Sequence, residues 1–309
     1  PLTSLKEITI PASVTSIGGY VFYGFTSLET VIFEAGSGVT KLGDELIPAD
    51  KPYWGQNIFA NTPALKTVVL PEDLTAIGPH CFENSTVENI TLPGTIRTIC
   101  DSAFKNCDNI TAVDFTSALI HVGAEAFFDC DKLEKADLVE GVQYLGVGAF
   151  GCCEQLKHAN IPATVSSMYG NPFLGCSGLE SYTVDAANDN FKVDSNGVIY
   201  DKDMYAILYY PATLTAETFE LPESVQEITP GAFSGAQFKN LQIPSRITQI
   251  ADYAFQNSAL ETVAFHKGIT SIGDHAFDGC SNLNNVVIPN SVLYAGHYAF
   301  ANCSSLSNV

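Results

Sequence analysis

The sequence is poor in positive charge. Its 309 residues include 14 lysines and arginines against 34 aspartates and glutamates, which gives a formal net charge of −20. Nucleic-acid binding and docking on anionic lipid both need clusters of basic side chains, so neither function fits this composition. Charged residues are also scarce in total, at 16% of the chain, and the surface must therefore rely on small polar side chains.

Long apolar runs and catalytic motifs are missing as well. No run of about 18 apolar residues occurs, so we expect no membrane-spanning helix and no direct membrane insertion. The common metalloprotease, hydrolase, P-loop and dinucleotide-binding motifs are absent, and the 6 histidines are scattered. Because catalysis requires groups that converge on one point, the sequence predicts a protein without enzymatic activity, cofactor or metal.

The chain instead repeats one phrase, L-x-x-[IV]-x-[IL]-P-x-x-[VI]-x-x-[IL]-G-x-x-A-F-x-x-C-x-x. Most repeats are 22 or 23 residues long, as from Leu133 to Leu156. A repeat of this length predicts a solenoid whose stacked coils share one continuous core. The phenylalanine of the phrase recurs at Phe22, Phe59, Phe82, Phe104, Phe127, Phe150, Phe173, Phe233, Phe255, Phe277 and Phe300.

Each part of the phrase predicts a local structure. The alternating apolar residues of the first part, such as Val68 and Leu70, predict a short strand, which ends at the following Pro71 because proline has no N–H for a ladder. The A-F-x-x-C part predicts one turn of helix or an irregular turn that buries the phenylalanine. We therefore expect a β-rich repeat solenoid of about twelve coils, a single domain over residues 1–309, cut from a longer protein.

Three segments show the phrase most fully: LPEDLTAIGPHCF from Leu70, IPATVSSMYGNPFLGC from Ile161 and IPNSVLYAGHYAFANC from Ile288. They resemble the BspA-type leucine-rich repeats of bacterial surface proteins. The resemblance implies a leucine-rich-repeat superhelix and an extracellular or cell-surface adhesion scaffold of a gut or oral bacterium, with its signal peptide and anchor outside this sequence. Its partner would be a host or bacterial surface protein or a glycan. A structural spacer that presents another domain is the alternative.

Two columns of residues are predicted to form the core. Six of the 9 cysteines follow the phenylalanine by three residues, where other coils have Ala, Ser or Thr, and this predicts a small buried slot. Parallel Cβ vectors on stacked coils oppose disulfide formation, so we expect free thiols. The predicted core columns include Phe104, Phe127, Phe150, Phe173, Cys107, Cys130, Cys153 and Cys176.

Two repeats are extended to 37 residues by inserts. The insert at 43–60 carries Tyr53 and the only tryptophan, Trp54, which fit either an exposed binding anchor or a plug for the solenoid edge. The insert at 189–211 contains Asn196-Gly197, which predicts a β-hairpin or meander. Asp194, Asn196 and Gly197 match part of an EF-hand loop, but Lys192 stands at its first ligand position, which argues against calcium.

The last three coils carry the remaining candidate binding residues. Stacking of these coils would align two neighbouring columns into a stripe of acidic and aromatic side chains. A surface that contacts a ligand or a metal fits this pattern, and so does a solvated turn edge. The two columns are Asp252, Asp274 and His297, and Tyr253, His275 and Tyr298.

Overall fold

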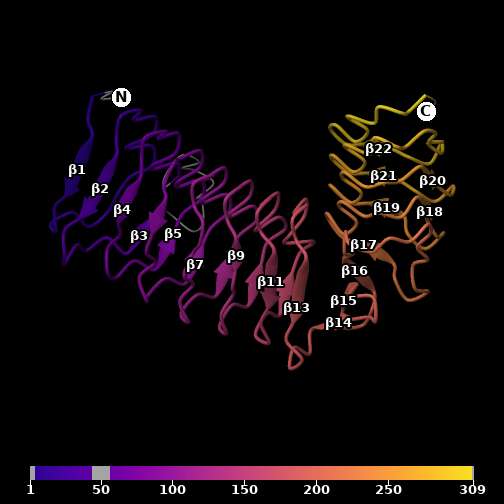
Figure 1. Ribbon diagram of the computed structural model, residues 1–309, viewed down its shortest axis with the longest axis horizontal. Helices are drawn as coiled ribbons and strands as arrows, with labels where there is room; N and C mark the ends of the chain where they lie inside the picture. The colour runs from indigo at the N-terminus through magenta and orange to yellow at the C-terminus, as the bar shows by residue number, and fades with distance from the viewer. Residues whose placement is uncertain (1–3, 44–55, 308–309) are drawn as a thin grey trace. The chain divides into compact units, whose positions relative to one another are not determined.

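The computed structural model describes residues 4–43 and 56–307, which form a β-solenoid of about 12 turns. Contacts within the chain define two compact units, unit 1 (Pro1–Ser167 and Gly178–Asn188) and unit 2 (Met168–Ser177 and Asp189–Val309). Within each unit, successive coils stack directly on one another (Figure 1). The described part of the chain contains no helix, and so none that is long and apolar enough to cross a membrane.

The first column of strands comes from the L-x-x-[IV]-x-[IL] part of the phrase. Neighbouring strands in each unit pair in parallel and in register, so that Ile8 lies opposite Val31. Alternate residues face the core, as Val31 and Phe33 do. The strands of this column are β1 (Glu7–Ile10), β2 (Thr30–Phe33), β4 (Thr67–Val69), β6 (Asn89–Ile90), β9 (Lys135–Ala136), β11 (His158–Ile161), β13 (Ser181–Val184), β18 (Asn240–Gln242) and β20 (Thr262–Ala264).

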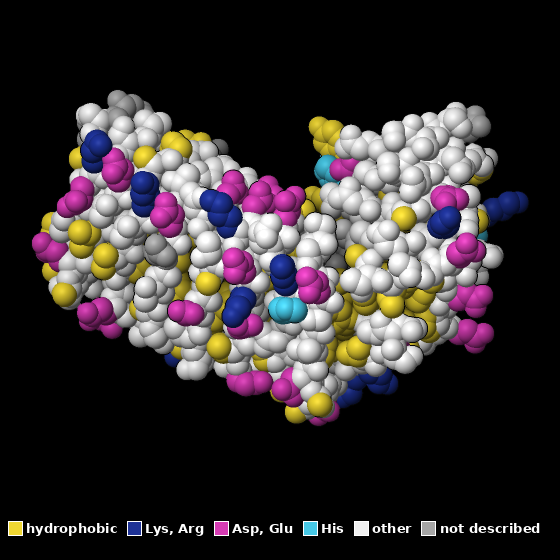
Figure 2. Space-filling model, viewed as in Figure 1, with side chains coloured by type: hydrophobic (Ala, Val, Ile, Leu, Met, Phe, Trp, Pro, Cys, Tyr) yellow, Lys and Arg dark blue, Asp and Glu magenta, His cyan; other side chains and the backbone are white. Residues whose placement is uncertain are grey.

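Charged side chains alternate in sign beside this column. Lys6 Nζ lies 2.9 Å from Glu29 Oε1, and Lys239 Nζ lies 3.2 Å from Glu261 Oε1. Figure 2 shows basic and acidic side chains alternating across the strands of unit 1. Like charges on adjacent strands would repel, so the alternation in sign favours this stacking.

A second column of two-residue strands precedes the glycine of the phrase. The glycine allows neighbouring coils to approach closely, because a Cβ added at Gly273 would lie only 2.5 Å from the backbone nitrogen of Asp252. The strands of this column are β3 (Lys41–Leu42), β5 (Ala76–Ile77), β7 (Thr98–Ile99), β8 (His121–Val122), β10 (Tyr144–Leu145), β12 (Ser167–Met168), β17 (Glu227–Ile228), β19 (Gln249–Ile250), β21 (Ser271–Ile272) and β22 (Tyr294–Ala295).

The A-F-x-x-C part forms irregular turns rather than a turn of helix. Residues two before and two after the phenylalanine adopt positive φ, as His80 (54°) and Asn84 (56°) do around Phe82. Two left-handed residues so close together exclude a right-handed helical turn. The backbone N–H of Phe82 instead donates to the Ala103 carbonyl of the next coil at 2.8 Å. Hydrogen bonds between coils therefore replace those of a helix.

The phenylalanines of these turns stack along the interior of each unit. In unit 1 the rings of Phe82 and Phe104 lie 5.1 Å apart and those of Phe104 and Phe127 lie 5.0 Å apart, with interplanar angles of 3° and 7°. This spacing is close to the rise of about 4.8 Å between parallel strands. Phe104, Phe127 and Phe150 are fully buried, and Phe173 in unit 2 is buried.

Unit 2 contains an antiparallel meander in the segment where the sequence predicts one. Its strands are β14 (Phe191–Val193), β15 (Ile199–Asp201) and β16 (Ala206–Tyr209), and β16 then pairs in parallel with β17. Asp194 Oδ1 accepts the backbone N–H groups of Asn196 at 2.8 Å and Val198 at 3.0 Å, while Gly197 has a φ of 82°. The Asp194 carboxylate thus closes the turn between β14 and β15.

Candidate interaction site

The six candidate residues of the last coils form one stripe in unit 2. The Tyr253 and His275 rings lie 5.1 Å apart at an interplanar angle of 5°, and the His275 and Tyr298 rings lie 5.0 Å apart at 24°. The sequence positions therefore correspond to a real stack of three rings. We call Asp252, Tyr253, Asp274, His275, His297 and Tyr298 the aromatic stripe.

The backbone fixes the register of these rings. Tyr253, His275 and Tyr298 occupy the left-handed position two residues before a core phenylalanine, with φ values of 58°, 53° and 54°. The N–H of Tyr253 donates to the Asp274 carbonyl, and that of His275 donates to the His297 carbonyl, both at 2.8 Å. Left-handed backbone is uncommon outside glycine, and these hydrogen bonds between coils stabilise it here.

The carboxylates of the aromatic stripe bind the backbone of the next coil. Asp252 Oδ1 accepts the Asp274 N–H at 2.8 Å, and Asp274 Oδ1 accepts the His297 N–H at 2.7 Å. The Tyr294 hydroxyl also donates to Asp274 Oδ1 at 3.1 Å. The hydrogen bond from the His297 backbone is the main cause that lowers the pKa of Asp274, and the bonds from the Tyr294 and His297 side chains lower it further. One oxygen of each carboxylate therefore joins its coil to the next one.

What the aromatic stripe presents to solvent is ring edges and polar atoms. His275 is stacked on both faces, and its Nδ1 lies 2.8 Å from Asp278 Oδ2. Tyr298 is 68% exposed, and the His297 side chain is 80% exposed. No cluster of three or more metal-binding side chains occurs among the residues that the structure describes. The stripe is suited to hydrogen bonding with a macromolecular surface.

The cysteine column is built into the core. Cys107 Sγ donates to the Phe82 carbonyl at 3.1 Å, and the thiols of Cys130 and Cys153 make the same contact with the phenylalanine of the preceding coil, at 3.2 and 3.1 Å. All nine cysteines lie within the described residues, and none forms a disulfide. Burial raises the pKa of the Cys107 thiol to about 12. Such thiols are poor nucleophiles at neutral pH.

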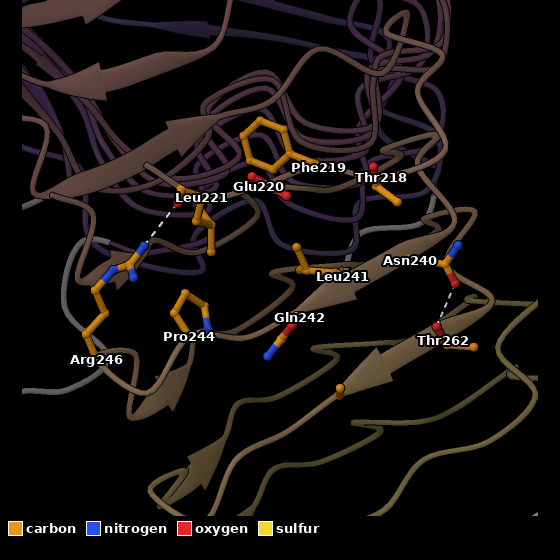
Figure 3. A pocket seen from close by; sticks show the side chains of 11 residues that line it. Thr218, Phe219, Glu220, Leu221, Asn240, Leu241, Gln242, Pro244, Arg246 and Thr262 are labelled. Atoms are coloured by element: carbon orange, nitrogen blue, oxygen red, sulfur yellow. Dashed lines mark hydrogen bonds between the residues drawn. The ribbon is translucent and has the colours of Figure 1, made fainter. Parts of the chain in front are cut away.

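Sequence reasoning missed a hollow on the strand face of unit 2. It has a volume of about 510 Å³ and spans three successive coils, which contribute Thr218–Leu221, β18 and β20 (Figure 3). Its lining residues are Thr218, Phe219, Glu220, Leu221, Asn240, Leu241, Gln242, Pro244, Arg246, Thr262 and Ala264.

One weak signal for this hollow is present in the sequence. The coil that borders it has Ala216 where most coils have leucine, and Phe219 where most have isoleucine or valine. Changes at two positions that hold larger or branched apolar residues in most coils indicate altered packing, but they do not indicate where space remains. The other candidates, Tyr53 and Trp54, lie outside the described residues.

The sequence also matches a model of a known repeat family. The BspA type leucine rich repeat region matches in six copies over residues 2–47, 53–180 and 207–309. The chain belongs to this family. Membership in a family of leucine-rich surface proteins indicates a protein-interaction scaffold, and such repeats are typically non-catalytic. No curated protein sequence matches the chain significantly.

Solved structures of bacterial repeat proteins share the fold. A leucine rich cell surface protein from Faecalibacterium prausnitzii A2-165 is 23% identical with a TM-score of 0.65, over 98% of this chain and 78% of that one. The pneumococcal vaccine antigen PcpA is 19% identical with a TM-score of 0.64, over 99% and 71%. A leucine-rich repeat protein from Eubacterium ventriosum ATCC 27560 is 20% identical with a TM-score of 0.54, over 92% and 78%. At these identities the likeness concerns the fold alone.

Proposed function

We propose that this BspA-type protein is an extracellular or cell-surface adhesion scaffold that binds a host or bacterial surface protein or a glycan. The aromatic stripe carries the proposal, because three rings from three coils stand in register at an exposed edge. Stacked coils offer long, regular surfaces for macromolecular partners. We expect no catalytic activity and no cofactor. Tyr53 and Trp54 remain proposed contributors to binding.

The names of similar proteins support the surface location. The Faecalibacterium protein is described as a cell surface protein, and the pneumococcal one as a vaccine antigen. The composition agrees, because a net charge of −20 does not favour nucleic acid or anionic lipid as partners.

A structural spacer is the second candidate function. The unbroken stack of buried rings in unit 1 favours it, since neighbouring coils are held both by ring contacts and by hydrogen bonds. A spacer needs this regularity but no exposed binding residues, so the two functions differ in what the aromatic stripe does.

Binding to immobilised surface ligands separates the two functions. The purified chain is passed over mucin glycans and extracellular-matrix proteins by biolayer interferometry, together with a Tyr253→Ser/Tyr298→Ser variant. A matched control is Tyr169→Ser, because Tyr169 is 64% exposed and lies outside the stripe. An adhesion scaffold should lose binding only in the stripe variant. Absence of binding to every ligand would favour the spacer, whereas equal binding by all three proteins would show that the aromatic stripe does not carry the adhesion.

A further inference from the structure

The hollow of unit 2 combines apolar walls with a polar rim. Phe219, Leu221, Leu241 and Pro244 supply the apolar surface (Figure 3). Asn240, Gln242 and Thr262 supply amide and hydroxyl groups, and the Thr262 hydroxyl donates to Asn240 Oδ1 at 2.7 Å. A volume of about 510 Å³ falls within the range of about 300–1,000 Å³ typical of ligand sites.

The hollow exists because pairing between two coils stops early. Thr218 and Asn240 form an isolated bridge, whereas β18 pairs with β20 over three residues. The Glu217 carbonyl accepts the N–H groups of Lys239 at 3.0 Å and of Asn240 at 3.2 Å. Beyond the bridge, no backbone hydrogen bond joins 220–221 to β18 among the described residues.

Arg246 holds the two coils together at one end of this opening. Its Nε donates to the Val225 carbonyl at 2.6 Å, and its Nη2 donates to the carbonyls of Leu221 at 3.0 Å and Pro222 at 2.7 Å. The guanidinium is therefore fixed to the preceding coil by three hydrogen bonds. Several of its donors are already used, which leaves it poorly placed to bind an acidic ligand.

Glu220 is the charged group in the hollow that remains available. It is exposed, and it makes no hydrogen bond or ion pair with any residue that the structure describes. It follows Phe219 directly, and both residues line the hollow. An acidic group beside an aromatic ring and an aliphatic floor is complementary to a lysine or arginine side chain, whose apolar stem ends in a cation.

We propose that the hollow binds a lysine or arginine side chain of an extended peptide segment in the protein partner. The proposal rests on the adhesion function and specifies the chemistry of one contact. The cation pairs with Glu220, its apolar stem lies against Phe219, and the peptide backbone bonds to Asn240, Gln242 and Thr262. The net charge of −20 draws basic partners toward the protein and repels acidic ones.

Titration with short peptides tests this site directly. The peptide acetyl-Thr-Val-Lys-Val-Thr-amide is added to isotope-labelled protein, and amide shifts are followed by NMR. We expect saturable shifts at residues 218–221 and 240–242. Replacing the lysine of the peptide by norleucine should weaken binding about fivefold, and replacing it by glutamate should weaken it further, since an exposed or partly exposed ion pair contributes this much.

Matched protein variants separate the site from general acidity. Glu220→Gln should weaken the affinity for the lysine peptide about fivefold. Glu223→Gln, which removes an exposed carboxylate outside the hollow, should leave binding unchanged. Phe219→Leu, which keeps an apolar wall, should also reduce affinity.

Two results would overturn the proposal: no saturable shift in the hollow, or equal affinity of the lysine and norleucine peptides. Equal affinity of the wild-type and Glu220→Gln proteins for the lysine peptide would overturn it too. None of these results would contradict the proposed adhesion function, because the surface-ligand assay tests that function separately with variants of the aromatic stripe.

Discussion

The same repeat packs its aromatic rings differently in the two units. In unit 1, Phe59, Phe82, Phe104, Phe127 and Phe150 form one parallel stack with centroid spacings of 5.0 to 5.4 Å. Near the start of unit 2, Tyr210, Phe219, Phe233 and Phe238 form a cluster with several edge-to-face contacts. The parallel stack resumes from Phe233 to Phe255 at 5.1 Å.

The difference shows what an insert does to a solenoid. The meander of 189–211 interrupts the repeat, and Ala216, at the position that a buried leucine holds in most coils, is exposed. Phe219 and Phe238 occupy the space around Tyr210 instead. The hollow borders this cluster, because Phe219 belongs to both. The irregular part of the repeat therefore lies beside the hollow of unit 2.

The largest effect is expected from removing a stacked ring. Phe150→Ala deletes a fully buried side chain whose ring centroid lies 5.4 Å from that of Phe127. The resulting cavity should lower the free energy of unfolding by about 3–5 kcal/mol. Thermal unfolding and hydrogen exchange measure this, and the loss of protection should be strongest in adjacent coils. The matched variant Phe233→Ala in unit 2 should cost less if its ring cluster can relax into the cavity. An unchanged melting temperature for Phe150→Ala would contradict the stacked core.

A smaller effect is expected where coils approach through glycine, and here the two units should behave alike. In Gly146→Ala the new methyl group meets the backbone of Ala124, and in Gly273→Ala it meets the backbone of Asp252. Each should destabilise the protein by about 1–3 kcal/mol, because backbone must shift. Gly94→Ala is the control, since a Cβ there has no neighbour within 4 Å. Denaturant titration measures the stability of each variant. Equal stability of all three would contradict the prediction and show that the spacing between coils can adjust to a methyl group.

The thiol columns of both units should respond alike to pH. Burial raises the pKa values of Cys107 in unit 1 and Cys280 in unit 2 to about 12. The thiol ionises at lower pH in the unfolded chain than in the folded one, so stability is fully present below pH 9 and falls as the pH rises toward 12. Native protein should react slowly with a thiol reagent, and denatured, unreduced protein should show nine free thiols. A count of about five or fewer would contradict the free columns.

The smallest effect concerns one exposed carboxylate of the aromatic stripe. The pKa of Asp274 is lowered chiefly by the hydrogen bond from the His297 backbone. Its contribution to stability is therefore present above the ordinary value of 3.8 and lost as the pH falls through the lowered value. Asp274→Asn should speed hydrogen exchange at the His297 amide and remove this acid dependence. Asp203→Asn, an exposed carboxylate of unit 2 outside the stripe, is the control.

Much of the fold follows from the sequence because each position of the repeat has the same structural environment in successive coils, so the same residue types recur there. The phrase predicts the first strand column, the buried phenylalanines and the small cysteine slot, but it did not predict the second column of two-residue strands. Asn196-Gly197 predicts the turn between β14 and β15, where only local backbone preferences matter. The choice between a helical and an irregular turn at the A-F-x-x-C part could not be made, because it depends on carbonyl groups of the next coil, about 22 residues away in the chain.

The candidate site was predicted less completely. The alignment of Tyr253, His275 and Tyr298 follows from the period of the repeat. The sequence does not predict that Asp252 and Asp274 accept hydrogen bonds from backbone N–H groups of the next coil. Residue identity alone does not distinguish a carboxylate with such a bond from one without it. The hollow could not be located from the sequence, since its space depends on where the backbone pairing between two coils stops.

By itself, the sequence determined the repeat length, the composition of each core column and the family, because every coil must bury the same faces against its neighbours. Only the tertiary structure decided which polar groups remain available to a partner. Asp274 and Glu220 are both acidic residues on the surface of unit 2, but one accepts hydrogen bonds from the next coil and the other has no partner among the described residues. That distinction depends on distances between coils, which residue identity alone does not specify.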